Sequence, residues 1–190
     1  MAISVTIGGP NIDGLELMSP SVPEFDTAVR SLFRGKSDRL LQMKPFVTIL
    51  SNHSDRTLVA YALKWEVARP GGRLTTTDQH KYPDAVAPSA PQRGNEIRPG
   101  ERNIALMSIE LDCGRWGSEP TEDFYLRQFI GWFKKYKDVS HLEISIDAAI
   151  FEDGALFGPN KSELDQHFTA YVDAKQEYYR TCKPSIWHVA

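Results

Sequence analysis

The chain has 190 residues, of which 41% are hydrophobic and 25% are charged, and its formal net charge is −3. This length suits one domain with a sizeable core, and the charge balance does not favour binding to nucleic acid or to an anionic membrane. No apolar run approaches the ~20 residues of a membrane span, and residues 1–14 lack the features of a signal peptide. We therefore expect a single domain, residues 1–190, in the cytoplasm.

The first predicted element is a helix over residues 21–34. Ser21 is placed to cap it and Gly35 to end it. Its apolar face repeats at helical spacing and consists of Phe25, Ala28, Val29, Leu32 and Phe33.

Residues 45–69 change to a period of two, with the polar stretch "SNHSDRT" in the middle. Alternation in the second half predicts a strand with one buried face, formed by Val59, Tyr61, Leu63, Trp65 and Val67. Asn, Ser and Asp bond their own backbone in turns, so we predict an antiparallel hairpin.

Residues 69–100 are rich in proline and glycine, and only "RLTTT" in this region suits a short edge strand. A connection of this length exceeds the ~12–15 residues of ordinary loops, which indicates either a functional or a mobile loop. The turn at Pro99–Gly100 then leads into a strand, "RNIALMSIEL". Residues 121–137 fit a helix, although their aromatic residues and Gly131 also suit a strand.

The last two elements have clear patterns. "HLEISIDAAIF" alternates like a strand, "EDG" predicts a turn, and "ALFG" is expected to pair back. A long amphipathic helix over residues 162–182 follows, with Ser162 and Asp165 resembling a capping box.

Strands separated by turns predict a mainly β fold, an antiparallel sandwich over residues 45–160 with a helix on either side. Trp65 lies where an immunoglobulin-like fold has its core tryptophan, but the flanking cysteines of antibody domains are missing. The stretches around Trp65, "IRPGE" and "FEDG…GP" resemble a loose set of uncharacterised bacterial proteins over residues 45–180. The resemblance implies an immunoglobulin-like sandwich and no known activity, so it transfers no catalytic residue.

Asp147, Glu152 and Asp153 form the acidic corner of "IDAAIFEDGALFGPN". A hard cation needs several oxygens that converge in one loop, and the spacing here does not match the twelve-residue calcium loop. Asp-Gly is a preferred hairpin turn because both residues tolerate positive φ. We interpret the corner as a turn, with ion binding as the alternative.

Other site chemistry has little support in the sequence. None of the five histidines lies three or four residues from another, and "GGPNIDG" and "PGGR" lack the lysine and the strand–loop–helix context of a phosphate loop. Cys113 and Cys182 belong to no paired motif, so free thiols are favoured over one disulfide. We expect no cofactor and assign no catalytic residue.

Aromatic and basic residues in loops are the best binding candidates. Arg115 and Trp116 lie between glycines in "GRWG", and Arg and Trp are enriched among residues that dominate binding. The alternative is that Trp116 covers the end of the sandwich. In "QHKYP" the candidates are His80, Lys81 and Tyr82, with an ordinary mobile loop as the alternative.

The sequence therefore predicts a non-enzymatic protein-binding or assembly module that presents loops from a β-sandwich to a protein partner. One alternative is a small metal-dependent or hydrolytic enzyme that uses the Asp147–Asp153 corner. Another is a structural subunit whose C-terminal helix packs in a homo-oligomer.

Overall fold

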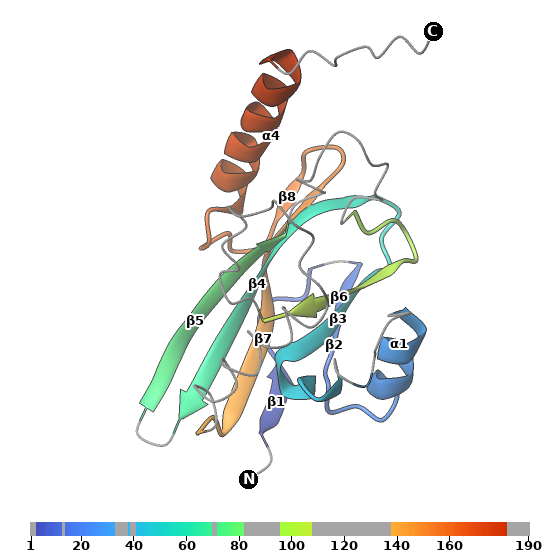
Figure 1. Ribbon diagram of the computed structural model, residues 1–190, viewed down its shortest axis with the longest axis vertical. Helices are drawn as coiled ribbons and strands as arrows, with labels where there is room; N and C mark the ends of the chain where they lie inside the picture. Colours follow the sequence, from blue (N-terminus) through green and yellow to red (C-terminus); the bar gives the residue numbers. More distant parts are fainter. Residues whose placement is uncertain are drawn as a thin grey trace, which may run out of the picture.

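The computed structural model describes residues 3–12, 14–32, 38, 41–69, 72–81, 96–107 and 138–181, and their strands form two sheets (Figure 1). In spatial order, the first sheet contains β1 (Ser4–Ile7), β7 (His141–Phe151), β4 (Leu58–Arg69) and β5 (Gly72–Lys81), and β8 (Leu156–Phe157) also pairs with β7. The second sheet contains β2 (Leu15–Met18), β3 (Val47–Asn52) and β6 (Arg102–Leu106). The helices are α1 (Phe25–Leu32), the 3₁₀ turn η1 (Lys44–Phe46) and α4 (Leu164–Thr181). The prediction of a mainly β chain is thus confirmed.

One hydrophobic core joins the two sheets. Trp65 of β4 is fully buried, and Ile146 of β7 is buried beside it in the same cluster as Leu17 and Leu50 of the second sheet. The predicted burial of Trp65 is confirmed. Burial also raises the pKa of Tyr61 above its usual value, since the phenolate would lose its hydration.

β1 runs parallel to β7, so the first sheet is mixed rather than antiparallel throughout as predicted. The chain leaves β1 through residues 8–14 and enters the other sheet at β2. β1 therefore has no hairpin partner and pairs with a strand far along the sequence. His141 reinforces the pair, because its Nδ1 lies 2.8 Å from Ser4 Oγ and its Nε2 lies 3.2 Å from Thr6 Oγ1.

The predicted hairpin of residues 45–69 is wrong, because β3 and β4 belong to different sheets. Both edges of β3 are already paired, with β2 and with β6, so β4 cannot join it. The stretch "SNHSDRT" is a turn as predicted, but it crosses between sheets. Buried Asn52 holds it: Nδ2 donates to the carbonyls of Arg56 and Ile97, both at 2.7 Å, and Oδ1 accepts from Ser54 N–H at 3.0 Å.

The proline- and glycine-rich connection is shorter than expected. Residues 72–81 form the ten-residue strand β5, which is paired antiparallel with β4, rather than a loop with a short "RLTTT" strand. Ile97 bridges to Leu58, and the predicted turn at Pro99–Gly100 leads into β6. Residues 121–137 and both cysteines lie outside the described residues.

α1 begins at Phe25, four residues later than predicted, and buries Phe25 and Val29. Ser21 does not cap it; its hydroxyl donates to the carbonyl of Val5 at 3.5 Å. Gly35 lies outside the described residues.

α4 starts against the outer face of the first sheet, where Leu164 is buried with Ala62 and Ala148. Its cap is Asn160 rather than the predicted Ser162. Asn160 Oδ1 accepts the N–H of Leu164 at 2.8 Å, and its Nδ2 donates to Asp165 at 2.6 Å. The buried Ser162 hydroxyl has no hydrogen-bond partner among the described residues.

Candidate functional site

Asp147 is buried on β7, with 3% of its surface exposed. Its Oδ2 accepts the N–H of Ser162 at 2.8 Å, and its Oδ1 accepts the N–H of Lys161 at 3.2 Å. The carbonyl of Asp147 accepts a third bond, from Asn160 N–H at 3.0 Å. This carboxylate fixes the chain just before α4 by satisfying backbone donors.

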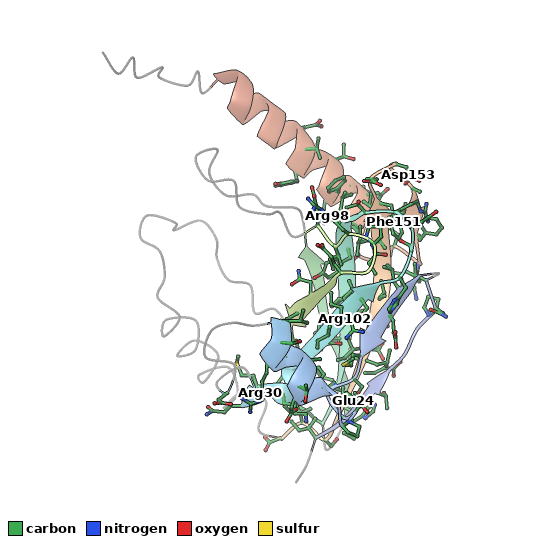
Figure 2. All side chains as sticks on the ribbon, turned by 90° about the vertical axis from the view of Figure 1, so that its right-hand side faces the viewer. Glu24, Arg30, Arg98, Arg102, Phe151 and Asp153 are labelled. Carbon is green, nitrogen blue, oxygen red and sulfur yellow. The ribbon has the colours of Figure 1, made fainter. Side chains whose placement is uncertain are left out.

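Glu152 and Asp153 are exposed in the predicted turn, which joins β7 to β8. Figure 2 shows Phe151 and Asp153 together at the end of the molecule where α4 begins. Only Gly154 has positive φ in this turn, at 80°, so the geometry is that of a longer hairpin loop with glycine at its end rather than an Asp-Gly turn with two positive φ angles. The hydrogen bond from the N–H of Ala155 is the main cause of a lowered pKa at Asp153. The hydrogen bond and positive charge of Arg56 lower this pKa further.

Arg56 ties the turn to the preceding connection. Its guanidinium lies 3.2 Å from Asp153 Oδ2 and stacks over the rings of Phe151 and Phe157, at 4.3 and 4.8 Å from their centroids. Glu152 Oε1 accepts the N–H of Thr57 at 3.3 Å. The three acids of the corner thus bind different protein groups, and within the described part of the chain no group of three or more His, Cys, Asp or Glu residues could hold a metal ion.

The structure describes two of the five predicted partner-binding residues. Arg115, Trp116 and Tyr82 lie outside the described residues. His80 and Lys81 end the strand β5, so they are not loop residues as predicted.

The structure instead presents a groove of about 500 Å³ at the edge of the sandwich. It lies where the chain crosses from β1 to β2, and two further residues are His53, just after β3, and Ile146 of β7. We call it the β1–β2 groove; it is lined by Ile7, Gly8, Gly9, Pro10, Asn11, Ile12, Gly14, Leu15, Glu16, Leu17, His53 and Ile146. Ile7 is 39% exposed, which is unusual for a residue on the same side of its strand as buried Val5.

The edge of β2 beside this groove carries backbone groups that have no hydrogen-bond partner among the described residues. The N–H of Asn52 donates to Glu101 C=O and its C=O accepts the N–H of Gly100, both on the side of β6. The next residue, His53, donates its N–H to Gly14 C=O. Because backbone pairing alternates along a strand, Gly14, Glu16 and Met18 bond to β3, while Leu15 and Leu17 direct their backbone groups outward. The N–H of Leu15 is bonded to Ile12 C=O, which leaves Leu15 C=O and both groups of Leu17 without a partner among the described residues.

The wall formed by residues 8–14 depends on glycine at two positions. Gly9 has φ +82°, and a Cβ there would lie 2.7 Å from Ser145 Cβ; Gly14 has φ +76°, and its Cβ would lie 2.7 Å from Ser54 Cβ. Positive φ and such close packing both favour glycine. The described residues of "GGPNIDG" therefore shape the groove between two strands.

At the rim of the groove, Glu16 Oε2 lies 3.0 Å from His53 Nε2, and both side chains are at least half exposed. Ile7, Glu16, Leu17 and His53, which line the groove, were not predicted as candidate site residues. The available signal was the alternation in "SVTI" and "LELM" on either side of a glycine-rich connection, which indicates two short strands but not that their edges meet.

No family model, curated protein or solved structure matches the chain. Within the described residues, no helix combines the length and the apolar character required to cross a bilayer. The assignment of function therefore depends on the geometry of the site.

Proposed function

We propose that the chain is a non-enzymatic protein-binding module of the cytoplasm and that the β1–β2 groove is its contact surface. The observation that carries the proposal is a groove of mixed polar and apolar lining, open to solvent along an edge of β2 that pairs with no described strand. Its size lies within the range of binding clefts, ~300–1,000 Å³. Exposed Ile7 and the free backbone groups of Leu17 offer a partner both apolar contact and hydrogen bonds.

The lining favours binding over catalysis. Among the described residues, the lining contains no Ser, Thr, Cys or Lys that could act as a nucleophile. Glu16 and His53, its two titratable residues, are both well exposed, whereas catalytic groups are usually tuned by burial and by specific neighbours. A partner that covers Ile7 removes apolar surface from water, which favours association by roughly 25 cal/mol per Å² before the costs of binding.

The test replaces Ile7 with Glu and measures capture of cellular partners by the tagged chain, quantified against wild type. We expect Ile7→Glu to reduce capture at least tenfold, because a charge would replace the exposed apolar side chain of the groove. Leu32→Glu on α1 and Leu156→Glu on β8 are matched controls, since these residues are 37% and 41% exposed. Figure 2 shows α1, with Glu24 and Arg30, and the β7–β8 hairpin at opposite ends of the molecule.

Thermal unfolding of each variant checks that it is folded. Equal capture by folded Ile7→Glu and wild type would reject the groove as the contact surface. Capture lost equally in all three variants would indicate a general effect of added charge instead.

We also propose an immunoglobulin-like arrangement of the sandwich, supported by the shared core around Trp65. The "GRWG" loop is the competing contact surface. If Trp116 lies at the centre of the interface, Trp116→Ala should reduce the binding free energy by at least about 2 kcal/mol, which weakens affinity roughly thirtyfold. Capture that is lost in folded Trp116→Ala but kept in Ile7→Glu would favour the loop over the groove.

A further inference from the structure

We infer that the partner enters the β1–β2 groove as an extended segment that adds a fourth strand to the second sheet, along the outer edge of β2. This inference rests on the proposed function and specifies the class of partner. Its basis is the alternation of backbone groups on β2, where Leu15 and Leu17 face away from β3. Strand addition to such an edge is a recurring mode of peptide recognition, in which main-chain bonds give affinity and alternate side chains give specificity.

β2 is a better template than β1. The outward carbonyl of Val5 on β1 lies within hydrogen-bond range of the hydroxyls of Ser19 and Ser21, at 3.4 and 3.5 Å. These hydroxyls occupy the outer edge of β1 at that point. On β2, the backbone groups of Leu17 have no hydrogen-bond partner among the described residues.

The side chains of β2 define what the added strand must carry. Leu15 and Leu17 point into the sandwich core, with 4% and 9% exposure, whereas the side chain of Glu16 is 70% exposed on the other face of the sheet. Residues opposite each other on neighbouring strands share a face. Partner residues beside Leu15 and Leu17 therefore enter the groove towards Ile7 and must be apolar.

The partner residue opposite Glu16 lies on the outer face and is basic, because opposite charges stabilise a cross-strand pair. His53 contacts the same carboxylate, with its Nε2 3.0 Å from Glu16 Oε2, so a basic partner residue would share Glu16 with this imidazole. The expected motif is apolar–basic–apolar in an extended conformation.

The groove limits the length of the added strand. The wall of residues 8–14 closes one end, and the contact between Ser19 and Val5 brings the two edges together at the other. The five residues from Gly14 to Met18 span roughly 17 Å at ~3.3 Å per residue. The partner segment therefore pairs over about three to five residues.

The experiment selects binders from a displayed library of random nine-residue peptides on the full chain, with Ile7→Glu as the counter-selection. Selected peptides are synthesised, and their dissociation constants are measured by fluorescence anisotropy at pH 7.5. Each is then N-methylated at one residue at a time, which removes a backbone N–H and keeps the side chain.

We expect the apolar–basic–apolar motif, and a methylation scan with a period of two in which alternate positions lose at least tenfold in affinity. Glu16→Lys should reverse the preference at the central position from Lys to Glu, while Glu16→Gln should only weaken it. A flat scan, a period near 3.6, or no enrichment over Ile7→Glu would overturn strand addition.

The two proposals fail separately. If Ile7→Glu abolishes partner capture but the methylation scan is flat, the groove remains the contact surface and the partner binds in another conformation. If capture is unchanged in folded Ile7→Glu, the proposed function itself fails.

Discussion

Asp147 is a buried carboxylate whose two oxygens both accept backbone N–H groups. A buried acceptor of this kind stabilises the fold only while its donors are satisfied, because an unpaired buried donor costs about 1–3 kcal/mol. Asp153, two positions beyond the end of β7, is exposed and can exchange its partners for water. Two acids of one short stretch therefore have opposite sensitivities to substitution.

Asp147→Asn should lower the free energy of unfolding by about 1–3 kcal/mol, because its amide NH₂ would face a backbone N–H. Asp153→Asn should leave the urea midpoint unchanged, since Asn also accepts the N–H of Ala155 and suits the turn. Urea unfolding of both variants is the measurement. A larger loss of stability in Asp153→Asn than in Asp147→Asn would mean that the acid in the turn, and not the acid before α4, is critical for the fold.

The start of α4 shows how one element depends on a single cap. Asn160 has φ +50°, in the left-handed region that Asn tolerates, and its side chain serves both Leu164 and Asp165. The amide of Asn160 is the main cause of a lowered pKa at Asp165. Because the pKa of Asp165 is lowered on folding, its ionised carboxylate contributes to the stability of the fold. This contribution is fully present above the ordinary pKa of 3.8 and is lost as pH falls through the lower pKa of the folded state.

Asn160→Ala should destabilise the chain by about 0.5–2 kcal/mol, the usual loss for an N-cap. Ser162→Ala should be neutral or slightly stabilising, because the hydroxyl is buried without a partner. Chemical unfolding near pH 7 compares them directly. A loss in Ser162→Ala as large as that in Asn160→Ala would restore the predicted capping box.

Local sequence patterns predicted the individual strands and turns better than they predicted which strands pair with each other. The turn at "SNHSDRT" follows from Asn and Ser chemistry, and the strand around Trp65 follows from its alternation. Membership of a sheet does not follow from either, because it was decided by β2 and β6 occupying both edges of β3. The groove was hidden for the same reason, since it exists only where the edges of two sheets meet.

At the scale of the whole molecule, the acids of the corner face different partners, and a divalent cation would have to displace those contacts. We expect millimolar Ca²⁺ or Mg²⁺ to leave the thermal midpoint unchanged. A ligand of the native state raises this midpoint with its concentration. A dose-dependent rise that disappears in Asp153→Asn would therefore contradict the structural role of the corner.

The parallel pairing of β1 with β7 also orders events during synthesis. Ser4 and His141 are 137 positions apart, so at ~5–20 residues per second β1 waits roughly 7–27 seconds for its partner strand. β2 and β3 can meet earlier, because far less chain separates them. Until β7 arrives, Ile7 has no sheet to hold it opposite β2. The groove is therefore complete only after Ile146, the part of its lining that β7 contributes, has been synthesised.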